Sequence, residues 1–283
     1  MTVLDLSQYD LPTLDAPCFK QAGVTGAILG VYTPQGPGAM GQAAQQLIDA
    51  GIAVHGFYGL IYFGSPTGAY RDTRWAIDLA KRFGVSRVWL DCEIDATAIG
   101  FTDAVTATPE SRVAEIRECV RLVEDAGLSA GIYSAAWWWP GNTGNTTEFA
   151  RLPLWHAVYL NDGMTVRYVN FGGWTECAIH QWTSLLNVCG RNRDANHVWD
   201  NSVLEEGDDA MTPEEREELQ ALVKIMGGRD KILDNAARGN DFILGYALEQ
   251  EKLAKHIANH VVSVTGQVQE HTHEIDVGRV IQP

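Results

Sequence analysis

The stretch VWLDCEID, residues 88–95, decides the fold class and supplies the first candidate site residues. Its apolar beginning predicts a buried β-strand, and its acids stand two positions apart where that strand ends. Because side chains alternate between the faces of a strand, we expect Asp91 and Glu93 on one side, with Asp95 as a third candidate. Two ionised carboxylates this close repel each other, so the pKa of one should rise, as the acid of a glycosidase requires. The alternative is that these acids only cap a strand end and bind helix N-termini or an arginine.

Short apolar runs alternate with amphipathic stretches on both sides of this segment. The strand candidates are residues 2–6, 26–32, 53–60, 87–92, 129–133, 154–159 and 178–183, and the helix candidates are residues 41–50, 73–83 and 109–126. Such alternation predicts βαβ units with parallel strands. About 200 residues with seven or eight strands favour an α/β fold, a shortened TIM-like (β/α) barrel, over an open doubly wound sheet. No GxGxxG follows the first strand candidate, and no P-loop pattern occurs.

Charge and hydropathy exclude several classes of protein. The 283 residues are 46% hydrophobic, which is enough for a sizeable core. With 21 basic and 36 acidic residues the net charge is −15, so we expect no binding to nucleic acid and repulsion from anionic membranes. No apolar run reaches about 18 residues, so we expect no membrane span.

The cysteines and the N-terminus predict a compartment. The five cysteines are odd in number and include no CxxC pair, which argues against a disulfide framework and against a zinc site. The first residues, MTVLD, lack a basic region followed by an apolar run, so we expect no signal peptide. These patterns predict synthesis in a reducing host cytoplasm, without export by the general route.

Composition changes near residue 205. All nine tryptophans and all five cysteines precede residue 200, and an acidic, linker-like run occupies residues 205–209. We therefore predict two parts: a barrel over residues 1–205 and a C-terminal helical segment for oligomerisation or attachment over residues 206–283.

Two further acids lie near the ends of the predicted barrel. Asp5 ends the first strand candidate, and Asp194 follows the last one. Because the first and last strands of a closed barrel are neighbours, Asp5 and Asp194 could converge on Asp91 and Glu93. The alternative is that each merely holds a turn, as aspartate often does.

Six short segments form an ordered set along the barrel part. They are residues 5–7 (DLS), 88–93 (VWLDCE), 131–134 (GIYS), 154–159 (LWHAVY), 180–184 (HQWTS) and 194–196 (DAN). As a set they resemble glycoside hydrolase family 25, the lysozyme-type muramidases of phage and bacteria. The resemblance implies a shortened (β/α) barrel that cuts β-1,4 bonds between N-acetylmuramic acid and N-acetylglucosamine, with no cofactor for catalysis.

The resemblance also implies roles for individual residues. Glu93 would be the general acid and Asp91 the partner carboxylate, with Asp5 and Asp194 as supporting acids. The side chains expected to bind substrate are Tyr32, Tyr58, Tyr133, Trp137, Trp138, Trp155 and Gln181. The chain departs from the family in two places: residues 27–32 lack the basic residue often seen there, and residues 55–59 lack the usual aromatic–His pair.

Three consecutive tryptophans, residues 137–139, follow a strand candidate and should lie on the active face. Indole rings stack on the apolar faces of pyranose sugars, so this loop could line a glycan groove. The alternative is that the triplet packs the barrel rim, although at least one of three adjacent rings should be exposed.

The C-terminal segment carries an oligomerisation pattern. Residues 240–264 show apolar positions spaced by three and four, which predicts a short coiled coil and a homo-oligomer, with a trimer favoured. His271 and His273 alternate onto one face, so a trimer would offer six imidazoles to one transition metal. The alternatives are a helix that packs on its own barrel and two solvated histidines.

Three functions remain open at this point. The first is a muramidase in a phage tail, a minor tail protein of the virion whose partners are cell-wall glycan and other tail proteins. The second is a catalytically weak or inactive glycan-binding adhesin of the same tail. The third is a bacterial wall-remodelling enzyme, which would normally need an export signal. The acids favour an enzyme over an adhesin.

Overall fold

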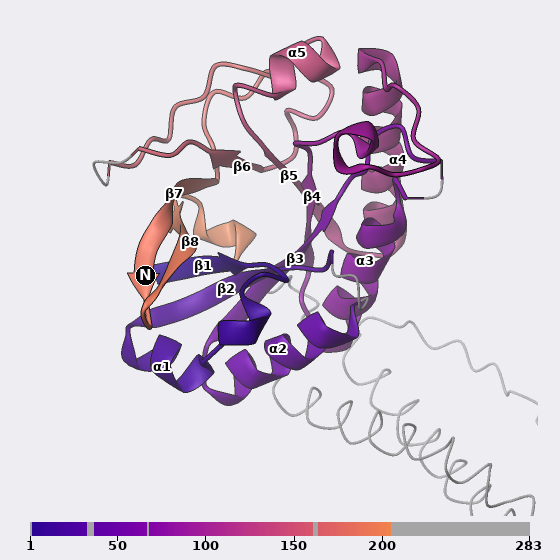
Figure 1. Ribbon diagram of the computed structural model, residues 1–283. Helices are drawn as coiled ribbons and strands as arrows, with labels where there is room; N and C mark the ends of the chain where they lie inside the picture. The colour runs from indigo at the N-terminus through magenta and orange to yellow at the C-terminus, as the bar shows by residue number, and fades with distance from the viewer. Residues whose placement is uncertain (1, 33–36, 67, 161–163, 205–283) are drawn as a thin grey trace, which may run out of the picture. The chain divides into compact units, whose positions relative to one another are not determined.

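The computed structural model describes residues 2–32, 37–66, 68–160 and 164–204. These residues form one closed barrel of eight strands that follow one another in chain order (Figure 1). The predicted α/β barrel is therefore confirmed. The predictions for residues 206–283, including the coiled coil, the trimer and the metal at His271 and His273, lie outside the described residues. In the described part of the chain no helix is long and apolar enough to span a membrane.

The barrel is parallel except where it closes. Each strand from β1 to β7 pairs in parallel with the next, whereas β8 is antiparallel to both β7 and β1. The strands are β1 Thr2–Leu6, β2 Val24–Gly30, β3 Ala53–Leu60, β4 Arg87–Asp91, β5 Ser129–Ser134, β6 Leu154–Ala157, β7 Ile179–Val188 and β8 Arg191–Val198. The all-parallel sheet predicted from sequence is wrong at this closure.

Strand β8 was not predicted because its sequence, RNRDANHV, has no apolar alternation. It forms a hairpin with β7, in which Cys189 and Gly190 between the strands both have positive φ. The sequence predicts that Asp194 follows the last strand, whereas in the structure it lies within β8.

Helices cover the outside of the first strands. The α-helices are α1 Ala16–Gln21, α2 Gly38–Asp49, α3 Arg71–Phe83, α4 Pro109–Asp125 and α5 Trp139–Thr143, with short 3-10 helices η1 Leu11–Thr13, η2 Ala96–Ile99 and η3 Asn201–Val203. Helix α4 begins as predicted, with Thr108 as N-cap in a reciprocal capping box with Ser111. Helices α1 to α4 lie along β1 to β5, whereas no described helix precedes β7 or β8 in the way that α3 precedes β4 (Figure 1).

The barrel interior is filled by a few large rings that face glycines. Trp89 and Trp155 are fully buried, with ring centroids 5.7 Å apart in an edge-to-face contact. A Cβ atom on Gly131 of β5 would lie 2.5 Å from the Trp89 ring, and one on Gly30 of β2 would lie 2.4 Å from the Tyr58 ring. Glycines on the strands therefore make the room that these aromatic rings fill.

A disulfide bond joins Cys18 at helix α1 to Cys189 in the β7–β8 turn. It overturns the expectation from the cysteine count. The two residues are 171 positions apart, so they meet only when the barrel closes and their spacing carries no signal. The other three cysteines, Cys92, Cys119 and Cys177, are free and buried.

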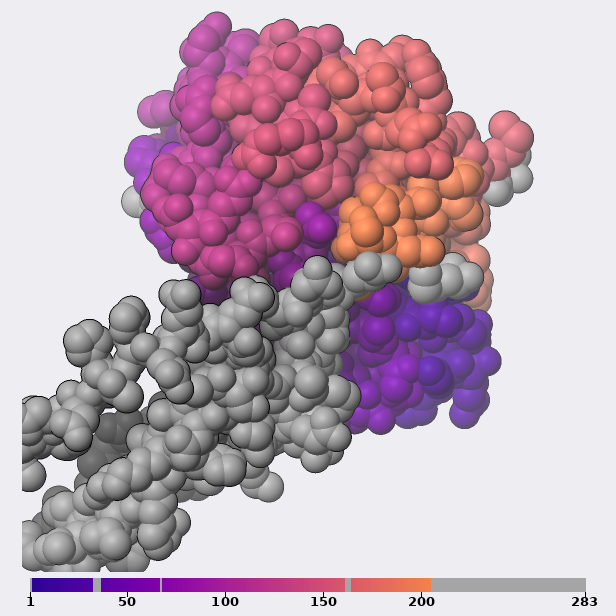
Figure 2. All heavy atoms as spheres, turned by 180° about the vertical axis from the view of Figure 1, so that it is seen from behind, coloured from indigo at the N-terminus to yellow at the C-terminus, as the bar shows by residue number. Residues whose placement is uncertain are grey.

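The described chain ends at the surface of the barrel. Its last residues, coloured orange, lie beside purple segments from the first half of the chain (Figure 2). The carbonyl oxygen of Leu204 lies 3.2 Å from Nδ1 of His55 on β3. Val203 is 3% exposed, so this end of the chain is packed onto the strands.

Candidate active site

The structure brings the four candidate acids together at one end of the barrel. Asp5 on β1 lies opposite Asp194 in the antiparallel pairing with β8. Asp91 is the last residue of β4, and Glu93 follows two residues later. A narrow cavity of about 50 Å³ is lined by Asp5, Asp91 and Asp194, together with Tyr58, Tyr133, Trp155 and Gln181. No lysine, arginine or histidine lines this cavity in the described part of the chain.

In the β1–β8 pair of acids, Asp5 is buried and held by two amides, whereas Asp194 is half-buried. Gln181 donates from Nε2 to one oxygen of Asp5 at 2.9 Å, and Asn196 donates from Nδ2 to the other at 2.8 Å. Burial, reinforced by the charge of Asp194, raises the pKa of Asp5 well above its usual value, although the amide hydrogen bonds partly offset this. Burial, and then the charge of Asp10, raises the pKa of Asp194 to about 6.

The amides that hold Asp5 are themselves fixed by aromatic residues. The Oε1 atom of Gln181 accepts hydrogen bonds from Tyr133 at 2.8 Å and from Tyr159 at 2.9 Å. Trp155 donates from its indole nitrogen to Asn196 at 2.8 Å. Gln181 is only 2% exposed, so the structure places this expected substrate ligand in the support of Asp5 and not on an open surface.

The β4 pair of acids is less supported by hydrogen bonds. Asp91 is 3% exposed, and one of its carboxylate oxygens is buried with no hydrogen-bond partner among the described residues. Burial, and then the charges of Glu93 and Asp5, raises the pKa of Asp91 well above its usual value. Burial, and then the charge of Asp194, raises the pKa of Glu93, which is half-buried. Because these carboxyl groups are buried close together, the geometry favours a state in which one of them keeps its proton while its neighbour ionises.

Asp95, the third acid of the predicted set, does not join the others. Strand β4 ends at Asp91, so strand alternation fixes the orientation of neither Glu93 nor Asp95. The Asp95 carboxylate instead forms a two-bond ion pair with Arg112 on α4. The expectation that it shares the face of Asp91 and Glu93 is wrong, whereas the alternative of an acid that binds an arginine holds for this residue.

The tryptophan triplet divides between surface and core. Trp137 is 69% exposed, whereas Trp138 is 4% exposed and stacks on Phe63 with ring centroids 5.2 Å apart. Trp139 is fully buried. The structure thus removes Trp138 from the expected substrate-binding residues, because its ring faces the protein and not the solvent.

The remaining side chains expected to bind substrate lie at the end of the barrel that carries the acids, which we call its mouth. Tyr58, Tyr133 and Trp155 line the cavity, and the Tyr32 ring contacts the Tyr58 ring with centroids 5.8 Å apart. Sequence reasoning missed Tyr159, which is 52% exposed and follows the end of β6. Its place at a strand end, four residues after Trp155, was the available signal.

A larger cavity, of about 370 Å³, lies at the other end of the barrel. It is lined by the first residues of β4 and β6, Arg87 and Leu154, and by Asp200 and Val203 near the end of the described chain. None of the four candidate acids lines it, so its size alone does not make it the candidate site. Within the described residues no group of three or more His, Cys, Asp or Glu residues could hold a metal ion.

The fold and the four carboxyl groups define a class of protein, an α/β-barrel with a carboxylate site at its mouth. Residues 3–182 match the family model described as lysozyme-like protein 1, and the chain belongs to this family. The resemblance to glycoside hydrolase family 25 is thereby confirmed.

Individual relatives agree with this assignment. The chain is 29% identical over 92 residues to "Probable GH family 25 lysozyme 3" of Dictyostelium discoideum. The matched region covers 32% of this chain and 19% of that protein. It is 28% identical over 190 residues to "Lysozyme-like protein 5" of Caenorhabditis elegans, which covers 64% of this chain and 84% of that protein. The chain spans less than a third of the length of the first curated relatives that it matches.

A solved structure shares the fold. The family GH25 lysozyme from Aspergillus fumigatus superimposes with a TM-score of 0.56 at 17% identity, over 72% of this chain and 98% of that one. The barrel of the present protein thus spans nearly the whole of that lysozyme.

Proposed function

We propose that the protein is a muramidase-type glycoside hydrolase that cuts β-1,4 bonds between N-acetylmuramic acid and N-acetylglucosamine in peptidoglycan. One observation carries the proposal: at the mouth of the barrel, a half-buried glutamate with a raised pKa stands beside a buried aspartate, one oxygen of which has no hydrogen-bond partner among the described residues. Family membership supports the same reaction.

Glu93 is the proposed general acid. Its raised pKa favours the protonated form, and that proton passes to the glycosidic oxygen as the bond to the sugar ring breaks. Positive charge then develops on the ring, where the Asp91 carboxylate stabilises it or orients the substrate's N-acetyl group as an internal nucleophile. In the second case no glycosyl-enzyme intermediate forms, and the separation of the carboxyl groups does not decide the stereochemistry.

The other two acids support this pair. Asp5 and Asp194 lie across the cavity from Asp91, and their charges raise the pKa values of Asp91 and Glu93 respectively. Trp137 is the proposed stacking surface for a sugar ring, because its exposed indole follows β5 at the same end of the barrel. No cofactor takes part in the proposed reaction.

Replacement of Glu93 by glutamine tests the proposal. Because general acid catalysis contributes on the order of 10² to 10⁴ in rate, Glu93→Gln should lower the release of reducing ends from purified peptidoglycan by that factor. Glu110→Gln is the matched control, since Glu110 is fully exposed at the start of α4 and should leave activity unchanged. Activity of Glu93→Gln within about threefold of wild type would contradict the role of Glu93. Binding of wild-type protein to peptidoglycan without any turnover would favour the adhesin instead.

The place of the protein in a phage tail is a separate proposal. It is supported by the sequence pattern of residues 206–283, where the predicted trimer would join the barrel to other tail proteins of the virion. Light scattering on the full-length protein should give the mass of a trimer, and a monomer would contradict it. Treatment with a chelator and the variant His273→Ala test the proposed metal site. A trimer that persists in both experiments would contradict the metal site. Mass spectrometry of purified virions tests the location.

A further inference from the structure

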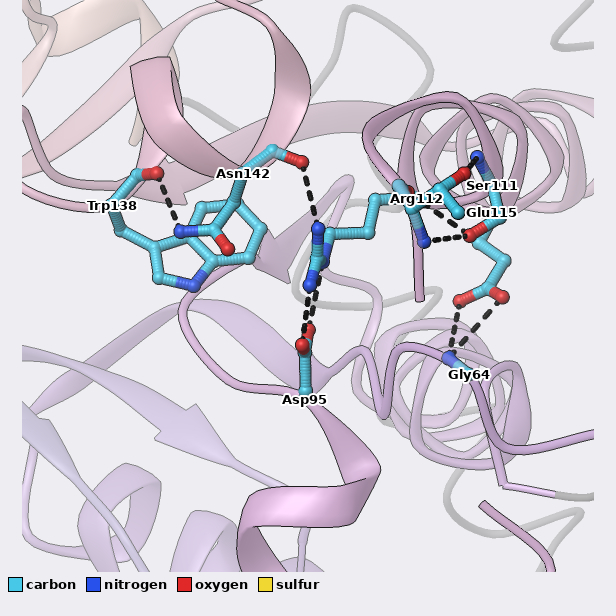
Figure 3. A network of polar contacts seen from close by, with 8 residues as sticks. Gly64, Asp95, Ser111, Arg112, Glu115, Trp138 and Asn142 are labelled. Atoms are coloured by element: carbon cyan, nitrogen blue, oxygen red, sulfur yellow. Dashed lines mark hydrogen bonds and ion pairs between the residues drawn. The ribbon is translucent and has the colours of Figure 1, made fainter. Parts of the chain in front are cut away.

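An arginine on helix α4 connects two segments at the mouth of the barrel (Figure 3). Arg112 is only 7% exposed, although it lies on an outer helix. Its Nε donates to Oδ1 of Asp95 at 2.8 Å, and its Nη2 donates to the other oxygen of the same carboxylate. Its Nη1 donates to the carbonyl oxygen of Asn142 at 3.2 Å. All three guanidinium nitrogens are therefore engaged.

The first segment held by Arg112 carries the proposed acid. Among the described residues no hydrogen bond reaches the Glu93 carboxyl group, so the backbone around Glu93 determines where that group lies. Upstream, the backbone is fixed by β4, and the nitrogen of Cys92 donates to the carbonyl oxygen of Tyr133 at 2.9 Å. Downstream, Ile94 packs against the cluster of Leu60, Tyr62 and Ala96, and the first described side chain with a hydrogen bond to another element is Asp95, through Arg112.

The second segment carries the exposed tryptophan. Asn142, whose carbonyl oxygen Arg112 binds, donates from Nδ2 to the carbonyl oxygen of Trp138 at 2.8 Å. This bond fixes the turn that follows Trp137 at the start of α5. Figure 3 shows Arg112 between the two segments, with Asp95 on one side and Asn142 on the other.

A third loop is attached to the same part of α4. The Glu115 carboxylate accepts the backbone N–H of Gly64 at 3.2 Å and 3.3 Å from its two oxygens. This loop also contains Phe63, whose carbonyl oxygen accepts the nitrogen of Ala96 at 2.9 Å. The first turns of α4 thus form a fixed support for the segments around Glu93 and Trp137.

We propose that Arg112 is a positioning residue for glycan cleavage, which holds Glu93 at the distance from Trp137 that a bound sugar requires. The inference rests on the proposed function. A planar guanidinium matches a carboxylate with two parallel hydrogen bonds and still has a third nitrogen for Asn142, whereas lysine offers a single charged centre. Small displacements of a catalytic group are sufficient to lower the rate strongly.

The test compares Arg112 with another arginine of the same helix. Arg117 also donates two hydrogen bonds to one carboxylate, that of Glu148, at 2.6 Å and 2.8 Å. Its side chain, however, is 58% exposed. Arg112→Lys and Asp95→Asn should each lower kcat on purified peptidoglycan by about 10-fold to 100-fold. The same residue change at the control position, Arg117→Lys, should leave kcat within about twofold of wild type.

The pH profile separates positioning from mere stability. Because burial raises the pKa of Glu93, a looser segment that exposes this group should lower its pKa. The basic limb of the kcat profile should therefore move to lower pH in Arg112→Lys and Asp95→Asn, whereas a purely structural change would lower the unfolding temperature without moving this limb. The double variant should be no worse than the more affected single one, because both remove the same link.

Each outcome decides the inference. Wild-type activity and an unshifted basic limb in both folded single variants would overturn it while leaving the proposed function intact. A lower unfolding temperature with an unshifted limb would also overturn it, as would effects that simply multiply in the double variant. An inactive wild-type protein would overturn the proposed function and this inference together.

Discussion

The antiparallel closure of the barrel and its parallel wall both supply acids to the candidate site, but different contacts hold the two regions in place. The closure, formed by β7, β8 and β1, supplies Asp5 and Asp194, and the wall at β4 supplies Asp91 and Glu93. Helix α4 holds the wall from outside through Arg112, whereas the closure is held by side-chain links between distant parts of the chain. A shortened barrel that lacks its last helices thus needs cross-links where a helix would otherwise pack.

Two links at the closure lie outside the cavity. Arg193 on β8 is 3% exposed, and it pairs with Asp10 while donating to the carbonyl oxygen and the hydroxyl of Thr13 at 3.0 Å and 2.8 Å. The Cys18–Cys189 disulfide joins the following helix to the β7–β8 turn. Both links connect the segment after β1 to the hairpin that completes the barrel.

The largest effect on stability is expected at Arg193. Arg193 is buried while Asp10 is 19% exposed, and Arg193→Ala removes this ion pair, both hydrogen bonds to Thr13 and the packing of the buried side chain, so it should lower the free energy of unfolding by about 3–5 kcal/mol. Arg121→Ala is the control, because the ion pairs of this exposed arginine within the described part of the chain are with Glu118 and Asp125 on its own helix, and its loss should leave the denaturation midpoint unchanged. Equal midpoints for the two variants in urea denaturation would show that the closure does not depend on this link.

Loss of the disulfide should have the next largest effect. A bridge over 171 residues restricts the unfolded chain strongly, so Cys18→Ala with Cys189→Ala should lower the free energy of unfolding by about 2–4 kcal/mol. Reductant should lower the unfolding temperature of the wild type to that of the double variant and leave the variant itself unaffected. If reductant lowers both alike, its effect does not pass through this bond.

A smaller effect, of opposite sign, is expected at Asp194. Its pKa is raised from 3.8 to about 6 in the folded protein, so the folded state is penalised once this group ionises. The full shift would correspond to about 3 kcal/mol, and solvent screening at this half-buried position reduces it, so Asp194→Asn should raise the free energy of unfolding by about 1–2 kcal/mol well above pH 6. The gain should shrink as the pH falls through 6 and vanish below 3.8, where the aspartic acid is protonated in both states. Thermal unfolding across this range measures it, and a gain that persists in acid would contradict the assignment.

Sequence could predict the wall better than the closure. The apolar run before Asp91 and the N-cap at Thr108 are local signals, and local signals suffice for a strand and a helix with regular neighbours. Strand β8 has no such signal, because its polar sequence becomes a strand through its pairing with β1 and β7.

The candidate site shows the same division. Asp5, Asp91 and Asp194 could be selected because their strands meet at one end of a closed barrel. The partner of Asp95 could not be predicted in this way, because Arg112 lies on a helix and is 17 residues further along the chain. The burial of Trp138 against Phe63 and the pairing of Cys18 with Cys189 likewise depend on contacts that exist only in the folded barrel.

The ring-and-glycine packing inside the barrel has a consequence for how the sequence can vary. Trp89 fits because positions 56 and 131 have no side chain, and Tyr58 fits because position 30 has none. A lineage that acquires alanine at position 131 must therefore also shrink the residue at position 89, so the two positions change together or not at all. Recombination between distant relatives that separates β4 from β5 would produce chimaeras with either a clash or a void directly beneath the acids.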